Sequence, residues 1–265
     1  MKSKSITFTS VLLFMVVAFL IMPGVGGAAM WIGLEGGANI VANGDVKGEV
    51  YYFSPLPGLR PNFRIKDVKT EASALGGVTI GYDFVKGGFL GYDWPKWMKY
   101  FSVAIDVTYN DFSQRSQSVR ATAPSGPPAG PIMQFPLQIS EANGYMVGLS
   151  MLFIAKYGFF SDPEFPFGRL IPYAGVGPAG FFSVVKTPIA FCYSSSSDSN
   201  EFGIVTEGGV RYMVWPQVSI DAAFRYRYVV PSYDVQYSSN FGNFREIGRI
   251  TAQQFSAIFR VNYHF

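Results

Sequence analysis

The chain has few of the residues on which a disulfide-bonded, metal-binding or nucleic-acid-binding protein relies. Its 265 residues include one cysteine, Cys192, and one histidine, His264. A lone cysteine excludes a disulfide within the chain, and this pair is too small a set for a zinc site. Charged residues make up only 15% of the chain, with a net charge of +3, and no run of lysine and arginine occurs. We therefore expect no cofactor, no metal and no nucleic-acid partner.

Long hydrophobic runs are also scarce, and the only one lies near the N-terminus, from Val11 to Met22. Lys2 and Lys4 precede it, and small residues follow it up to Ala29. This order predicts a signal peptide, residues 1–29, and a mature domain, residues 30–265. An uncleaved membrane helix is less well supported, because the run is shorter than the roughly 20 residues that span a bilayer.

Aromatic residues, by contrast, are abundant, at 17% of the chain, and they follow an alternating pattern that is clearest at the end of the chain. From Phe255 to Phe265, aromatic and aliphatic residues form one row, and Arg260 and His264 belong to the other. Successive side chains of a strand point to opposite faces, so this strand has an apolar and a polar face. A soluble sandwich would rarely end on an exposed phenylalanine, whereas a transmembrane barrel turns its apolar face to lipid and its polar face to the lumen.

The same alternation predicts about eight strands. They cover residues 31–42, 74–84, 100–110, 143–156, 169–185, 203–214, 218–228 and 255–265. The fourth strand has apolar residues on both rows, which leaves its faces unassigned. Prolines and glycines in the fifth predict a bulge or a tight barrel wall. Trp215, Pro216 and Gln217 predict a tight turn between the sixth and seventh strands.

Four long connections lack the alternation and are predicted to be loops: residues 43–69, 113–141, the serine run around 194–199, and 231–249. Shorter connections lie between them. This alternation of long and short is typical of extracellular loops and periplasmic turns. The short connection of residues 87–99 is predicted to hold an amphipathic turn at the membrane surface. The tryptophans fall at the predicted periplasmic ends, which favours an interfacial girdle of Trp31, Trp94, Trp97 and Trp215.

These patterns predict an all-β fold, a membrane-spanning antiparallel up-and-down β-barrel of about eight strands with four long extracellular loops. The segments GGVTIGYDF, IPYAGVGPAG, EGGVRYMVWPQVSIDAAFRYRY and FRVNYHF resemble small OmpA-like and opacity-type outer-membrane barrels. The resemblance implies a bacterial outer-membrane location, outer-membrane lipid and the barrel-assembly machinery as partners, and a monomer. It also implies that the assembly machinery reads the final row, Phe259, Val261, Tyr263 and Phe265. No peptidoglycan-binding domain is expected after the barrel.

The polar rows of the predicted strands collect acids and bases in nearly equal number. The acids are Glu35, Asp83, Asp106, Glu207 and Asp221, and the bases are Arg211, Arg225, Arg227 and Arg260. The interior of an eight-stranded barrel is just wide enough for side chains to fill it, so buried charges there must find partners. We predict a network of ion pairs that fills the lumen. The alternative is a narrow charged pathway for small solutes.

Three classes of function follow from this fold. An enzyme is disfavoured, because His264 has no HxS-type pairing and the serines of residues 194–197 are interpreted as a linker, although paired acids alone suffice for some hydrolyses. A structural or surface-interaction role, in adhesion or recognition of an extracellular ligand, is favoured by aromatic residues in the long loops. These are Tyr51, Tyr52, Phe53, Phe63, Tyr233, Tyr237, Phe241 and Phe244. They could instead fold back over the barrel mouth. The remaining alternative is a small channel or carrier for minor solutes.

Overall fold

The structure is a computed structural model in which residues 30–52, 62–84, 93–114, 116–124, 132–139, 142–187, 195–230, 232–239 and 242–265 are described. The predicted signal peptide, residues 1–29, lies outside these ranges. The described elements are almost all strands. In order they are β1 Met30–Tyr52, β2 Asn62–Thr70, β3 Ser73–Asp83, the 3-10 turn η2 Lys96–Tyr100, β4 Phe101–Gln114, β5 Gln117–Pro124, β6 Ile132–Ile139, β7 Ala142–Lys156, β8 Leu170–Thr187, β9 Ser195–Trp215, β10 Val218–Val229, β11 Ser232–Ser239 and β12 Gly242–His264.

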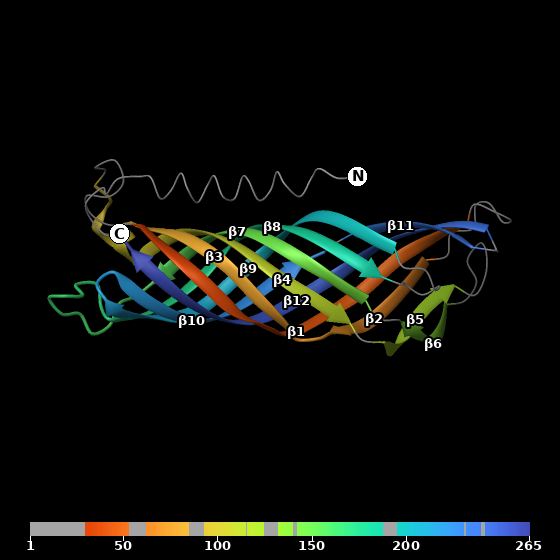
Figure 1. Ribbon diagram of the computed structural model, residues 1–265, viewed down its shortest axis with the longest axis horizontal. Helices are drawn as coiled ribbons and strands as arrows, with labels where there is room; N and C mark the ends of the chain where they lie inside the picture. Colours follow the sequence, from red (N-terminus) through yellow and green to blue (C-terminus); the bar gives the residue numbers. More distant parts are fainter. Residues whose placement is uncertain are drawn as a thin grey trace.

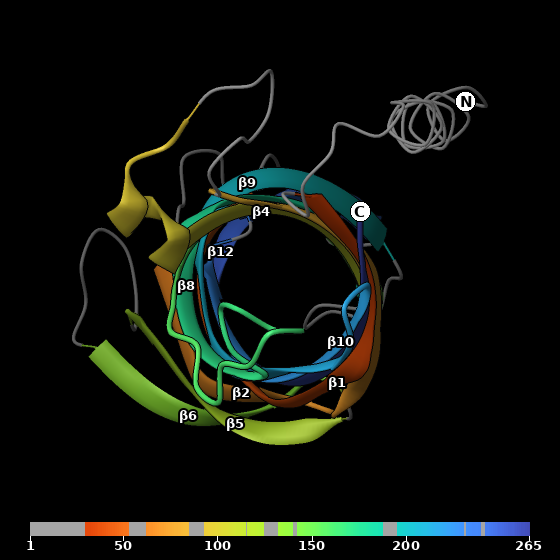
Figure 2. The same cartoon turned by 90° about the vertical axis from the view of Figure 1, so that its left-hand side faces the viewer.

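Eight of these strands close into a ring. Its order is β1, β3, β4, β7, β8, β9, β10 and β12, every neighbouring pair is antiparallel, and β12 returns to pair with β1. Figure 1 shows the tilted strands from the side, and Figure 2 shows the ring from the end that bears the short turns. Closure leaves no unpaired strand edge in the wall, which a lipid environment requires. The predicted eight-stranded up-and-down barrel is therefore confirmed.

The barrel has apolar residues outside and polar residues inside. On the outer face, Leu34 and Phe224 are 69% and 71% exposed, whereas Asp106 and Arg225 on the inner face are 0% and 1% exposed. This reverses the arrangement of a soluble protein, whose apolar side chains are buried and whose charges face water. It is the arrangement expected of a barrel whose outer face is covered by lipid.

The loop predictions were too broad, because regular strands continue well beyond the alternating segments. β1 pairs with β12 up to Tyr52 and Phe244, and β2 occupies part of the predicted loop of residues 43–69. The predicted loop of residues 113–141 contains the β5–β6 hairpin. The serine run from Ser195 onward belongs to β9, and the predicted loop of residues 231–249 holds β11 and the start of β12. Backbone hydrogen bonds between strands form whatever the side chains are. Strands outside the lipid therefore need no alternation of apolar and polar residues.

Two ambiguities about the wall are resolved. On β7, Tyr145, Leu149, Met151 and Phe153 face outward, and Met146, Leu152 and Ile154 are buried inside. On β8, the pairing with β7 and β9 keeps one register throughout, so the structure favours the tight wall over the bulge. A Cβ placed on the inward Gly177 would collide with the backbone carbonyl of Met151.

The short turns lie at the end opposite β5, β6 and β11. In the β7–β8 turn, the Asp162 carboxylate accepts hydrogen bonds from the N–H groups of Glu164 and Phe165, at 2.9 and 2.7 Å. Both hydrogen bonds, and the one from Phe165 most strongly, favour the ionised carboxylate and lower the pKa of Asp162. Between β9 and β10 the chain reverses at Pro216 and Gln217, as predicted. Within the described ranges, no helix is long and apolar enough to cross a membrane.

Candidate functional site

Arg225, on β10, is the centre of the charge network inside the barrel. Its guanidinium contacts three carboxylates: Glu207 at 2.5 Å, Asp106 at 2.5 Å and Glu35 at 3.2 Å. In the ring of eight strands, the β4 strand that carries Asp106 stands directly opposite β10. The salt bridge between Arg225 and Asp106 therefore crosses the lumen.

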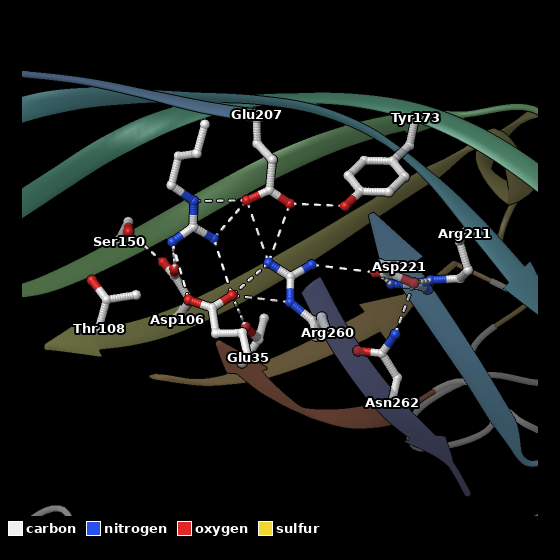
Figure 3. A network of polar contacts seen from close by, with 12 residues as sticks. Glu35, Asp106, Thr108, Ser150, Tyr173, Glu207, Arg211, Asp221, Arg260 and Asn262 are labelled. Atoms are coloured by element: carbon white, nitrogen blue, oxygen red, sulfur yellow. Dashed lines mark hydrogen bonds and ion pairs between the residues drawn. The ribbon is translucent and has the colours of Figure 1, made fainter. Parts of the chain in front are cut away.

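Arg260, on β12, is the second hub. It donates to Glu35 at 2.7 Å, to Glu207 at 3.2 Å and to Asp221 at 3.3 Å. Figure 3 shows Arg260 between Glu207 and Glu35, so both carboxylates contact both arginine hubs. Such shared, charge-assisted contacts fix the geometry of the centre more firmly than separate pairs would.

Two further ion pairs lie nearer the short-turn end. Arg211 binds Asp221 through two parallel hydrogen bonds, of 2.9 and 3.1 Å. Asp83 pairs with Lys156 at 2.5 Å and also accepts a hydrogen bond of 2.6 Å from Ser102. Lys156 was absent from the predicted network because apolar residues on both rows of its strand left the faces of that strand unassigned. Its parity with Met146, Leu152 and Ile154 on the inner row of β7 would have indicated that it faces the lumen.

Arg227 is buried like the other arginines, but it has no carboxylate within 4 Å among the described residues. It donates instead to Asn110 and Thr108 on the opposite strand β4, at 3.3 and 3.0 Å, and its Nε has no partner in the described part of the chain. The central cluster holds four acids, Glu35, Asp106, Glu207 and Asp221. Only three arginines pair with them within the described residues, namely Arg211, Arg225 and Arg260. The charge of Arg227 therefore brings the cluster to neutrality from a distance.

Neutral side chains complete the network, and the sequence alone did not single them out. Tyr173 on β8 donates to Glu207 at 3.0 Å, and Thr79 on β3 donates to Glu35 at 3.2 Å. Ser150 on β7 donates to Asp106, and Asn262 on β12 donates to Asp221 at 2.9 Å. With these residues, every strand of the ring contributes a side chain to the network.

Trp31 does not belong to the interfacial girdle, which corrects the prediction. It is 1% exposed and lies inside the barrel, where the Arg211 guanidinium stacks over its ring at 4.3 Å. The reason is its parity, since Trp31 is on the same row of β1 as Glu35. A Cβ at Gly81, directly opposite on β3, would overlap the indole, so this glycine makes room for it.

The other predicted girdle residues lie at the short-turn end, outside the ring. Trp97 and Trp215 are 60% and 61% exposed. Trp94 is half-buried, donates to the Tyr82 hydroxyl at 3.1 Å and packs against Phe84. The final row of β12 also faces outward, with Phe259, Val261, Tyr263 and Phe265 about half exposed.

His264 faces the lumen, as predicted, but it does have a serine partner, which corrects the expectation of no pairing. Its Nε2 lies 2.9 Å from the Ser219 hydroxyl on β10. Ser219 is 0% exposed and also accepts a hydrogen bond from Asn262 at 3.0 Å. A nucleophile needs access to a substrate, so this buried pair is better suited to stabilising the structure.

Comparisons with known proteins bear on this barrel at two levels. The sequence model of the outer membrane protein beta-barrel domain matches residues 24–265. The chain belongs to this family. It therefore resides in the bacterial outer membrane, and the ends with the long and short connections are the extracellular and periplasmic ends. No relative is found among curated protein sequences.

Among solved structures, OprG from Pseudomonas aeruginosa is similar, with a TM-score of 0.52 and 14% identity over 90% of this chain and 96% of that one. Neisserial surface protein A has a TM-score of 0.37 and 15% identity, covering 88% and 96%. Ail, the attachment invasion locus protein of Yersinia pestis, has a TM-score of 0.27 and 10% identity, covering 85% and 97%. At such low identity the likeness to OprG shows the shared fold alone.

Proposed function

We propose that this outer-membrane barrel is a closed scaffold that displays its extracellular strands in a structural or surface-interaction role. The observation that carries the proposal is the reach of Arg225 across the lumen to Asp106. Charges that conduct a solute line a wall and leave water between them, whereas these side chains contact one another from opposite walls. The proposal therefore assigns the network to holding the barrel closed.

Liposome swelling tests the closed lumen. Liposomes that contain the wild-type protein should swell in small sugars and amino acids no faster than empty liposomes. A double variant, Arg225→Ser with Arg260→Ser, removes both hubs and should admit the smallest solutes, provided that the folded, heat-modifiable form is still obtained. Fast swelling with the wild-type protein would instead support the alternative of a small channel or carrier.

The surface-interaction half of the proposal rests on the extracellular strands. β1 and β12 have 23 residues each, about twice the roughly 9–11 that cross a bilayer. The β5–β6 hairpin lies outside the ring in Figure 2, and β6 is the last strand of the sheet order. The side chains of the loop aromatics that suggested recognition lie outside the described part of the structure. The proposal for this half therefore rests on strand length and position.

Replacing residues 117–139 by a short glycine-serine linker tests this half. Cells that carry the full-length protein should bind extracellular-matrix protein or host cells better than cells that carry the shortened protein. The barrel itself should fold equally well in both, because β5 pairs with only a short part of β2. Equal binding by the two strains, at equal surface amounts, would count against a recognition role for this hairpin.

The proposal includes no catalytic role. Besides the occluded pair of Ser219 and His264, the acids of the lumen are engaged by arginine or lysine at short range. Paired carboxylates that hydrolyse a substrate need space for it and for water between them. Modification of lipid A in cells that express the protein, lost on changing Glu207 to Gln, would overturn this assignment.

A further inference from the structure

A shelf of basic and aromatic side chains lies on the outside of the barrel at its periplasmic end. It consists of Lys96, Trp97, Lys99 and Tyr100 of η2, together with Tyr157, which directly follows β7. In Figure 2, η2 is the yellow turn that stands outside the ring of strands. The shelf is therefore at the outer surface, separate from the lumen network.

Its aromatic half continues the lipid-facing surface of the wall. Tyr100 stacks on Tyr157 with nearly parallel rings, 5.7 Å apart and inclined by 7°. Trp97 packs edge-on against Phe101 at 5.8 Å, and Phe101 is the first residue of the outward row of β4. Trp97 is also 60% exposed, so most of its ring is available to whatever surrounds the barrel.

Its basic half has no acidic partner among the residues that the structure describes. Lys96 and Lys99 are exposed, and no carboxylate of the described residues lies within 4 Å of either ammonium group. The Lys99 ammonium lies 5.0 Å above the Tyr100 ring, a contact that leaves its charge unneutralised. Arg169, at the same end of the barrel, differs because it pairs with Asp162 and Glu164.

Both halves lie next to Phe101, where the outward apolar row of β4 begins, and so at the edge of the apolar outer surface of the barrel. Tryptophan and tyrosine favour the zone where a bilayer changes from acyl chains to headgroups, and lysine side chains reach from it toward phosphate groups. The periplasmic leaflet of an outer membrane consists of phospholipids, so an anionic headgroup is the negatively charged group nearest to the shelf. A free phosphate ion would use the lysines but would gain nothing from Trp97 and Phe101.

We propose that the shelf is a binding site for an anionic phospholipid of the periplasmic leaflet. Lys96 and Lys99 bind the headgroup phosphate, Trp97 lies at the level of the glycerol backbone, and the acyl chains follow Phe101 along β4. This site goes beyond the proposed function, which concerns the lumen and the extracellular strands, and it does not depend on whether the lumen is closed.

Retention of lipid by the purified full-length protein tests the proposal. The protein is extracted from vesicles of equal parts phosphatidylglycerol and phosphatidylcholine, and the lipids bound to it are counted by native mass spectrometry. The wild type should retain phosphatidylglycerol preferentially. Because a lysine near an anionic surface favours binding about fivefold, Lys96→Gln with Lys99→Gln should remove most of this preference. Changing Lys47 to Gln, an exposed lysine at the extracellular end, should leave it intact.

A second measurement separates a lipid site from general attraction of anions. Phosphatidylglycerol with brominated acyl chains should quench the fluorescence of the wild type more than brominated phosphatidylcholine does, and Trp97→Phe should remove the difference. Excess soluble glycerol phosphate should not displace the retained lipid. Equal retention of the two lipids by the wild type, equal losses in the Lys47 variant and the double variant, or displacement by glycerol phosphate would each overturn the proposal.

Discussion

At the scale of single residues, the arginines of the lumen differ in what they neutralise. Arg225 contacts three carboxylates, whereas Arg227, two positions along the same face of β10, contacts neutral oxygens only, within the described part of the chain. Removing one partner of a buried ion pair leaves an uncompensated charge, and that is what makes such changes costly. The two arginines therefore form a matched pair for mutation.

We expect Arg225→Met to lower the free energy of unfolding by about 3–5 kcal/mol, because Glu35, Asp106 and Glu207 lose a shared counter-charge. Arg227→Met should lower the free energy of unfolding clearly less, since it leaves no adjacent carboxylate without a counter-charge. Urea unfolding of the protein in lipid vesicles, followed by tryptophan fluorescence, measures both. Equal losses for the two variants would show that the network is not centred on Arg225.

A second residue-scale prediction concerns the space around Trp31. Gly81→Ala places a methyl group where the indole lies, and overpacking of this kind costs about 1–3 kcal/mol. Gly76→Ala on the same strand is the control, because its nearest neighbour would be the Glu35 carbonyl at 3.9 Å. Gly81→Ala alone should unfold at a lower urea concentration and show a changed tryptophan emission spectrum. An unchanged spectrum would mean that Trp31 does not occupy the lumen.

The charged residues that parity assigned to the inner face are all buried, because side chains alternate between the two faces, but Lys156 was missed. Parity did not predict their partners, since these depend on the stagger of strands that are far apart in the sequence, such as β4 and β10. For Trp31, parity gave the right face and the residue type gave the wrong one. Its residue type suggested the membrane interface, but its position on the row of Glu35 already placed it inside.

At the scale of single elements, β8 tests how closely the strands pack. Gly177→Ala would force a methyl group against the Met151 carbonyl, so the variant should unfold at lower urea concentration than the wild type. Gly180→Ala, on the same strand, meets nothing within 4 Å and should be close to neutral. If both variants unfold together with the wild type, the wall is not tight at Gly177.

The last strand gives another prediction at this scale. The N–H of Phe265 donates to the Met30 carbonyl at 3.0 Å, so the final residue takes part in closing the ring. Deleting Phe265 should therefore reduce the heat-modifiable, folded fraction in outer membranes more than it reduces synthesis. Phe255→Ala, an exposed residue of the same strand, is the control and should assemble nearly normally. Normal assembly of the deletion would argue against an assembly signal at this end.

The elements differ in how far the sequence predicts them. The eight strands of the wall are recognisable because lipid on one side and a polar lumen on the other impose strict alternation. β2, β5, β6 and β11 are outside that environment, so their sequences carry no such pattern and appeared as loops. Pro136 lies within β6, which is the edge strand of the sheet, and edge strands are where proline is tolerated.

At the scale of the whole molecule, the barrel combines an apolar outer surface with a charged interior whose described acids and bases balance. Its salt bridges join strands that are far apart in sequence, such as Arg225 with Glu35 and Arg260 with Glu35. In the closed scaffold that we propose, the same side chains therefore close the lumen and hold the ring together. The extracellular strands can then vary without altering the wall, which suits a scaffold that displays them.

Conductance across a planar lipid bilayer tests this account most directly. The folded wild-type protein should insert without producing discrete current steps, because Arg225 reaches Asp106 on the opposite wall of the lumen and Arg260 joins Glu35, Glu207 and Asp221 beside it. The Arg225→Ser, Arg260→Ser variant should produce small but resolved steps. Stable, reproducible channels formed by the wild type, with the same conductance as those of the variant, would contradict the closed lumen.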